Sequence, residues 1–140
     1  KPLLDPLELQ KFIKTAIKSP NQIFIAKSKT NKQGYFNRNL PKIITDVSDN
    51  LLYISRSSIP SNKNSKFQKA FGQVNIYSYP KKILKNKIKN KKTFYEKIED
   101  IEILRFLESG HKIKVINMKK STQPVDTKSD LFKVKKLLLK

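Results

Sequence analysis

The sequence contains no cysteine, and this absence excludes a disulfide scaffold, a thiolate metal site and a cysteine nucleophile. A single histidine leaves little scope for a Ser-His-Asp triad or a histidine-rich metal centre. No apolar run reaches about 18 residues, so no membrane span is indicated. The 140 residues are 37% hydrophobic, which allows one domain with a modest buried core and argues against a wholly disordered chain.

The chain is strongly basic, with a formal net charge of +20. Such a charge is typical of nucleic-acid-binding proteins, because Lys and Arg neutralise phosphates. However, 28 of the 31 basic residues are lysines spread along the chain, beside 16 Ile and 11 Asn, and this profile also follows from A/T-rich codons. Arginine, which phosphate and base contacts favour, is scarce. Codon bias is therefore the favoured explanation. The alternative is a basic non-catalytic nucleic-acid-binding module that stacks bases on Phe94 and Tyr95.

Hydrophobic spacing and turn residues predict helices and strands in alternation. Strands are expected over residues 22–26, 42–45, 51–55, 73–79 and 112–117, and the second and third of these should form a hairpin. Helices are expected from Asp5-Pro6 to Ser19, over about 81–88, over 95–109, and from Thr127 onward. Residues 27–41 and 57–66 are expected to be loops. This order predicts a single α/β domain whose mixed sheet is covered by helices on both faces.

Four stretches carry residue types that are suited to chemistry. Ser55-Arg56 lies just past an expected strand and is followed by Ile59-Pro60, and Ile76 to Tyr79 lies on a later strand. The segment from Ile98 to Glu108 is rich in acids, and the segment from Val125 to Leu131 precedes and begins the last helix. In this order the four stretches resemble the motifs of the cytidylyltransferases that make CMP-activated acidic sugars. These are the 3-deoxy-manno-octulosonate (Kdo) enzymes and the related acylneuraminate enzymes.

The resemblance implies a Rossmann-like nucleotide-diphospho-sugar transferase fold, of which these residues would be the C-terminal portion. In the family, a Gly-Asp-x stretch with a metal-binding Asp precedes Pro-Leu-x-x-Pro, and Lys1 to Pro6 resembles that join. The N-terminal half that holds CTP would then be absent, so we expect residues 1–140 alone to be inactive. For the complete protein the resemblance implies a cytoplasmic, homodimeric enzyme of lipopolysaccharide biosynthesis.

The implied reaction is nucleotidyl transfer from CTP to a 2-keto acidic sugar. The anomeric hydroxyl of the sugar attacks the α-phosphate of CTP, and pyrophosphate leaves. Mg²⁺ held by carboxylates would neutralise the charge that develops on the phosphate oxygens. Asp126 is the implied ligand for Mg²⁺ in this chain. The alternative is that Asp126 is only a helix-start residue beside Thr127.

Arg56 is the candidate catalytic residue. An arginine at a strand end can hold a carboxylate or a phosphate through two hydrogen bonds, whereas the alternative is a surface ion pair of little effect. Gln73 and Tyr77 lie on a strand whose end should approach the sugar, so they are candidate substrate-binding residues. Some Kdo enzymes have His in place of Gln73 and Gln in place of Ile103. These departures favour a sialic-acid-like or unusual ulosonate sugar.

Glu99 and Glu102 are three positions apart and should share one helix face. The resemblance places this helix along the sugar pocket, so both are candidate substrate-binding residues. The alternative is a solvated acidic face, and we expect that role for Glu96 and Glu108. Arg105 is expected to brace Glu99 and Glu102 rather than to contact the substrate.

Overall fold

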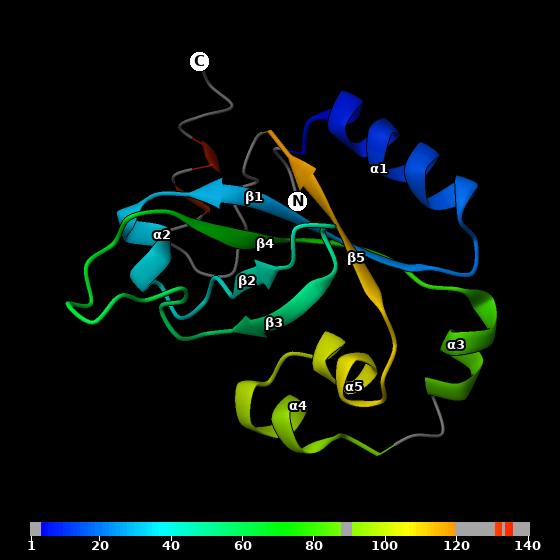
Figure 1. The fold of residues 1–140 in the computed structure, drawn as a ribbon. Helices are drawn as coiled ribbons and strands as arrows, with labels where there is room; N and C mark the ends of the chain where they lie inside the picture. Colours follow the sequence, from blue (N-terminus) through cyan, green and yellow to red (C-terminus); the bar gives the residue numbers. More distant parts are fainter. Residues whose placement is uncertain (1–3, 88–90, 120–130, 133, 136–140) are drawn as a thin grey trace.

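A computed structural model describes residues 4–87, 91–119, 131–132 and 134–135 of the chain. Its centre is a five-stranded sheet with the strand order β3-β2-β4-β1-β5 (Figure 1). The strands are β1 (Ile23–Thr30), β2 (Lys42–Thr45), β3 (Leu51–Ser55), β4 (Ala70–Ser78) and β5 (Ile113–Met118). The helices are α1 (Pro6–Lys18), α2 (Lys32–Phe36), α3 (Lys81–Lys87), α4 (Phe94–Glu99) and α5 (Ile103–Glu108). Within the described ranges, no helix combines the length and the apolar character that crossing a bilayer requires.

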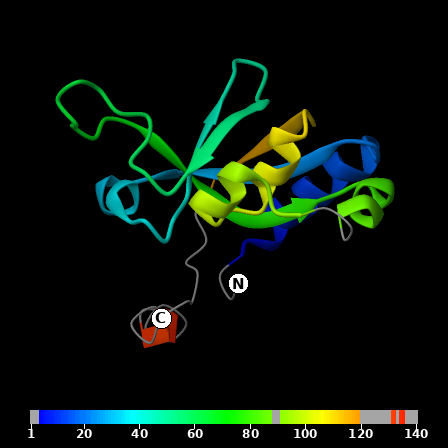
Figure 2. The same cartoon turned by 90° about the horizontal axis from the view of Figure 1, so that it is seen from below.

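The sheet is mixed, as predicted. β1 pairs in parallel with β5 and antiparallel with β4. β2 is antiparallel to β3 and meets β4 at the pair of Lys42 and Gly72. Figure 2 shows that the β2–β3 hairpin projects away from the rest of the sheet. The pair of Lys42 and Gly72 is therefore the point at which the hairpin joins the other strands.

Helices cover both faces of the sheet. On one face, Phe12 and Ala16 of α1 form a buried cluster with Phe24 of β1 and Val74 of β4. On the other face, Leu104 of α5 belongs to a larger buried cluster with side chains from β1, β2, β3 and β5. Removal of these apolar side chains from water stabilises the layers. The predicted α/β class and its two covered faces are confirmed.

The first helix and the hairpin form where the sequence predicts them. The Asp5 carboxylate accepts a hydrogen bond from the backbone N–H of Leu7 at 2.9 Å and caps α1. In the turn between β2 and β3, Asp46 accepts hydrogen bonds from the side chain and the backbone N–H of Asn50. These bonds lower the pKa of Asp46. Local side-chain capping therefore accounts for both elements.

Residues 27–41 contain more regular structure than the predicted loop. β1 continues to Thr30 and includes Lys27, which is only 6% exposed. A buried charge would be costly if it had no partner. The Lys27 ammonium donates to Thr45 Oγ1 and Asp49 Oδ1, each at 2.7 Å, so burial leaves the charge well paired. The short helix α2 then begins after Asn31, whose side chain caps it. The extra strand residues and the helix correct the loop expected from polarity.

The prediction of one helix over residues 95–109 is wrong. α4 ends at Glu99, Asp100 adopts the left-handed conformation with φ 50°, and α5 begins at Ile103. Aspartate is among the residues that adopt this conformation most readily. The predicted helix rests on an apolar face formed by Ile98, Ile101, Leu104 and Leu107. In the structure Ile101 and Leu104 are buried, whereas Ile98 is 64% exposed. The predicted apolar face is therefore divided between α4, the connection and α5, and it is only partly buried.

Glu96 and Arg105 form a buried ion pair that joins α4 to α5. Arg105 Nη2 lies 2.6 Å from Glu96 Oε1, and Nε lies 2.7 Å from Oε2. Glu96 is 2% exposed, so its predicted solvated role is wrong. Glu108 is exposed, but its carboxylate accepts the backbone N–H of Tyr95 at 3.0 Å and of Glu96 at 3.2 Å, which caps α4. Arg105 therefore pairs with Glu96, an acid for which a solvated role was predicted.

We expect Glu96→Gln to lower the free energy of unfolding at pH 7 by about 3 kcal/mol, because it removes the charged partner of a largely buried ion pair. Hydrogen bonds from Arg105 lower the pKa of Glu96 below its ordinary value of 4.5. The stabilisation is therefore present above the unfolded pKa and is lost as the pH falls through the lower folded pKa. Urea denaturation of both proteins at about pH 7 and pH 3.5 checks this expectation. An equal difference at both pH values would contradict it.

Candidate functional site

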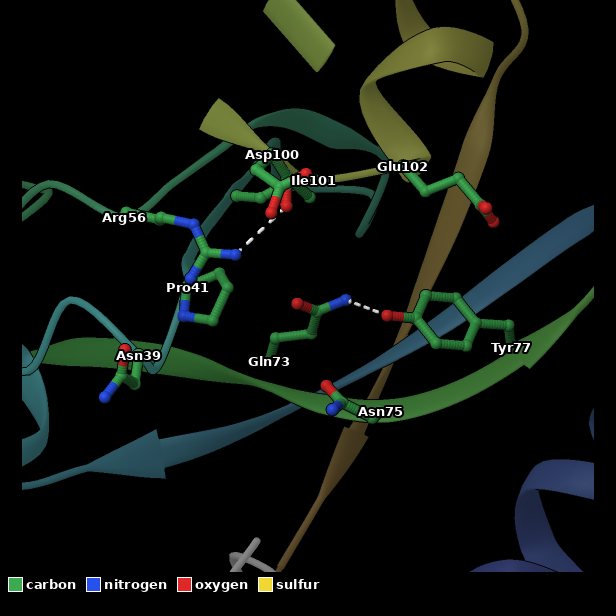
Figure 3. A pocket seen from close by; sticks show the side chains of 9 residues that line it. All are labelled: Asn39, Pro41, Arg56, Gln73, Asn75, Tyr77, Asp100, Ile101 and Glu102. Atoms are coloured by element: carbon green, nitrogen blue, oxygen red, sulfur yellow. Dashed lines mark hydrogen bonds between the residues drawn. The ribbon is translucent and has the colours of Figure 1, made fainter. Parts of the chain in front are cut away.

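A pocket of about 450 Å³ opens where four segments of the chain meet (Figure 3). These segments are the loop before β2, the residue after β3, one face of β4, and the connection between α4 and α5. The lining residues are Asn39, Pro41, Arg56, Gln73, Asn75, Tyr77, Asp100, Ile101 and Glu102. Amide, phenol, guanidinium and carboxylate groups predominate, so the pocket is suited to a small polar ligand.

Arg56 is held in the pocket by backbone carbonyls. Its Nε donates to the Glu99 carbonyl at 2.6 Å, and its Nη2 donates to the Asp100 carbonyl at 3.0 Å. Its Nη1 donates to the Arg38 carbonyl at 3.2 Å. These bonds use three of the five guanidinium donors. Within the described ranges Arg56 forms no ion pair with a carboxylate, so its charge is available to an anionic ligand.

Glu99 holds the Arg56 segment in place through its carboxylate. Its Oε2 accepts the backbone N–H of Arg56 at 2.9 Å, and its Oε1 accepts the hydroxyl of Ser55. The prediction that Glu99 and Glu102 share a helix face is wrong, because α4 ends at Glu99 and Glu102 is the N-cap of α5. Glu102 lines the pocket and Glu99 does not. This arrangement favours a positioning role for Glu99 over the predicted contact with substrate.

β4 presents Gln73, Asn75 and Tyr77 to the pocket from alternate positions, which place side chains on one face of a strand. Gln73 is buried, and its Nε2 donates to the Tyr77 hydroxyl at 2.6 Å. Burial raises the pKa of Tyr77, and the negative charge of Glu102 raises it further. Tyr77 is therefore a neutral phenol near pH 7, able both to donate and to accept a hydrogen bond.

The pocket contains a guanidinium at one end and a carboxylate at the other, and Asp100 also lies near the guanidinium end. In Figure 3 the Arg56 guanidinium lies at one end, and the Glu102 side chain extends toward the other end, where Tyr77 lies. The amides of Gln73 and Asn75 lie between them. A ligand with one anionic group and several hydroxyls matches this distribution of donors and acceptors.

Four predicted site residues lie together in this pocket: Arg56, Gln73, Tyr77 and Glu102. Asn75 was not predicted, although the alternation of β4 places it beside Gln73 and Tyr77. Asn39 and Pro41 were also missed, because their segment carries no periodic signal and was expected to be a loop. Asp126, the predicted metal ligand, lies outside the described residues.

Across the described ranges, no three His, Cys, Asp or Glu side chains gather to hold a metal ion. Proteins hold Mg²⁺ with one or two carboxylates together with substrate phosphates and water. Asp100 and Glu102 line the pocket, but the carboxylate predicted for Mg²⁺ lies outside the described part. The described residues therefore do not assemble a magnesium site, and we assign no step to this ion.

Comparison with known proteins gives consistent matches. Residues 1–113 match the family described as Cytidylyltransferase. The 3-deoxy-manno-octulosonate cytidylyltransferase of Chloroherpeton thalassium is 39% identical over 105 residues, which cover 74% of this chain and 43% of that protein. The corresponding enzyme of Protochlamydia amoebophila is 31% identical and covers 99% of this chain and 56% of that protein. The 8-amino-3,8-dideoxy-manno-octulosonate cytidylyltransferase of Shewanella halifaxensis is 29% identical. That match covers 93% of this chain and 54% of that protein.

A solved structure of CMP:2-keto-3-deoxy-manno-octonic acid synthetase complexed with CTP shares the fold. Its TM-score is 0.88 at 24% identity, and the match covers 99% of this chain and 58% of that chain. The predicted Rossmann-like fold is thereby confirmed. The chain spans about half the length of the curated relatives it matches. Since the family match extends over residues 1–113, the chain belongs to the cytidylyltransferase family.

Proposed function

We propose that the full-length protein transfers CMP from CTP to a Kdo-type acidic sugar and releases pyrophosphate. Membership of the cytidylyltransferase family supports this proposal, as do the names of the curated relatives. The chain spans about half of those relatives, so the activity is proposed for the longer protein. The same names favour a Kdo-type sugar over the sialic-acid-like branch that Gln73 and Ile103 favoured in the sequence.

Arg56 is the observation that carries the proposal. A 2-keto acidic sugar has a carboxylate next to its anomeric carbon. The carbonyls of Glu99, Asp100 and Arg38 use three donors of the guanidinium, so two donors remain. A carboxylate can accept two hydrogen bonds from one arginine. Because those carbonyls already fix the guanidinium, little side-chain entropy is lost on binding. Arg56 would hold the reacting end of the sugar.

The other pocket residues would bind the hydroxyls of the sugar. Gln73, Asn75 and Tyr77 offer both donors and acceptors, and Glu102 offers acceptors. Binding at both ends would orient the anomeric hydroxyl toward the α-phosphate of CTP. A bond then forms between the anomeric oxygen and the α-phosphorus, the bond to the bridging oxygen of pyrophosphate breaks, and the hydroxyl proton is released. No covalent enzyme intermediate is required.

The metal, the assembly and the location of the full-length protein are also part of this proposal. Asp126 would be a ligand of Mg²⁺, which when bound would neutralise charge on the phosphates. A homodimer and a cytoplasmic location are supported by the family resemblance of the sequence alone.

The alternative nucleic-acid-binding module gains no support from Phe94 and Tyr95. These side chains are 67% and 47% exposed, but their rings meet edge to face with centroids 5.2 Å apart. Tyr95 also contacts Tyr53 edge to face at 6.1 Å. Rings arranged in this way do not form the parallel platforms on which successive bases stack.

Pyrophosphate release by the full-length gene product tests the proposed function. We expect turnover with CTP and Kdo, and slower turnover with N-acetylneuraminate. Residues 1–140 alone should release no pyrophosphate, because they correspond to about half of the relatives. The absence of a CMP-sugar product with Kdo, its 8-amino derivative and N-acetylneuraminate would overturn the proposal. Turnover by residues 1–140 alone would contradict the second expectation.

A further inference from the structure

Lys42 occupies the point where the strands that carry the pocket meet. It is the first residue of β2 and is 0% exposed. Its cross-strand partners are Ser55 of β3 and Gly72 of β4. The residues that directly follow these partners, Arg56 and Gln73, line the pocket. Lys42 therefore lies between two ligand-binding candidates without lining the pocket itself.

The three donors of the Lys42 ammonium are matched by three backbone carbonyls. Nζ lies 3.0 Å from the carbonyl oxygen of Asn37, 2.8 Å from that of Leu40, and 2.8 Å from that of Arg56. A buried ammonium with all its donors satisfied is compatible with a stable fold, whereas carbonyls left without it would be costly. One side chain thus ties the segment before β2 to the residue after β3.

The segment before β2 is held against the pocket by two further contacts. The Pro41 carbonyl accepts the backbone N–H of Gln73 at 2.9 Å. The Leu40 side chain lies directly over Gly72, where an added Cβ would come within 2.8 Å of Leu40 Cδ2. Glycine at position 72 therefore allows the close approach. Asn39 lies between Arg38 and Leu40, whose carbonyls accept hydrogen bonds from Arg56 and Lys42. Asn39 lines the pocket.

Lys42 also carries its charge close to Arg56, because its ammonium donates to the Arg56 carbonyl. Burial, and then the charge of Arg56, lower the pKa of Lys42, while Glu99 raises it. Three carbonyl acceptors at 2.8 to 3.0 Å match the charged ammonium, which has three donors, better than the neutral amine, which has two. Lys42 and Arg56 are thus neighbouring cations, and the Glu99 carboxylate lies beside them.

We propose that Lys42 is a positioning residue that orders the Asn37–Pro41 segment and Arg56, and thereby sets the affinity for an acidic sugar. The identity of that ligand rests on the proposed function. Lys42 makes no contact with substrate in this role, because its ammonium is enclosed by the carbonyls. Its loss should therefore affect the binding of the sugar more than the binding of CTP.

Steady-state kinetics of the full-length protein with Lys42→Met test this role. We expect the KM for Kdo to rise about tenfold and the KM for CTP to change less than about twofold. Lys27→Met is the matched control, because Lys27 is also buried but donates to Thr45 and Asp49, outside this pocket. The control should lose thermal stability with both KM values changed less than about twofold. A folded Lys42→Met protein with wild-type KM for Kdo, or with equal changes in both KM values, would overturn the proposal.

Amide hydrogen exchange gives a readout that does not depend on activity. Peptides that cover residues 37–41 and 56–60 should exchange faster in Lys42→Met than in Lys27→Met. If Lys42→Met does not fold, Lys42→Gln serves instead, because its amide keeps two donors, and we expect about a threefold rise in the KM for Kdo. If the wild-type protein makes no CMP-sugar, the proposed function fails. The exchange comparison then tests by itself whether Lys42 orders the Asn37–Pro41 segment and Arg56. Unchanged exchange in both peptides would then overturn that role.

Discussion

Arg56→Met is expected to lower kcat/KM for the acidic sugar about 10³-fold in the full-length protein. The variant removes two hydrogen bonds to a carboxylate, each worth about 2 kcal/mol, and each 1.4 kcal/mol corresponds to about tenfold. The KM for CTP should change less, because the guanidinium lies at the sugar end of the proposed reaction. Pyrophosphate release over a range of sugar concentrations at saturating CTP measures the effect.

Two further variants separate binding of the sugar from structural roles of Arg56. Arg56→Lys keeps the charge but loses the planar fork, so it should recover only part of kcat/KM. Arg38→Met is the matched control, because the Arg38 side chain is exposed. Arg56 donates to the backbone carbonyl of Arg38, which the substitution leaves in place. The control should stay within about twofold of wild type. A folded Arg56→Met protein with wild-type kcat/KM would show that Arg56 only bridges the segments around the α4–α5 break.

The elements that the sequence predicted correctly are those with local signals. α1 begins at Asp5 because capping acts within one turn, and the β2–β3 hairpin forms around a turn that Asp46 stabilises. β1 runs beyond its predicted end because its last residues pair with β4, and there Lys27 meets Thr45 and Asp49, which are distant in the chain. The hydrophobic pattern of a single segment contains no information about such partners.

The candidate site was predictable only in part, for the same reason. Family motifs pointed to Arg56, and strand alternation placed Gln73 and Tyr77 on one face. The break after Glu99 was not predictable, because the apolar spacing fits one continuous helix. The carbonyls of Glu99 and Asp100 at the break accept from Arg56, which is distant in the sequence. Lys42 could not be singled out among 28 lysines, because its burial and its three carbonyl partners appear only in the folded chain.

Asp126→Asn is expected to lower the rate of CMP-sugar formation about 10²-fold or more in the full-length protein, with little change in melting temperature. Asparagine has nearly the size of aspartate and can still cap a helix, so a purely structural role predicts little change in stability or rate. A role as a ligand of Mg²⁺ predicts a large change, because a neutral oxygen replaces a negative one where a hard cation binds. The rate across a Mg²⁺ titration distinguishes the two roles.

Asp5→Asn is the matched control, because Asp5 is an aspartate whose carboxylate caps α1 in the structure. It should leave both the rate and the Mg²⁺ dependence near those of wild type, which defines the effect of losing a carboxylate at a helix start. Calorimetric titration of Mg²⁺ in the presence of CTP gives a second readout, and Asp126→Asn should bind the ion more weakly. If Asp126→Asn matches Asp5→Asn in rate at every Mg²⁺ concentration and binds the ion as wild type does, Asp126 is a helix-start residue. The carboxylates for the metal must then come from elsewhere in the longer protein.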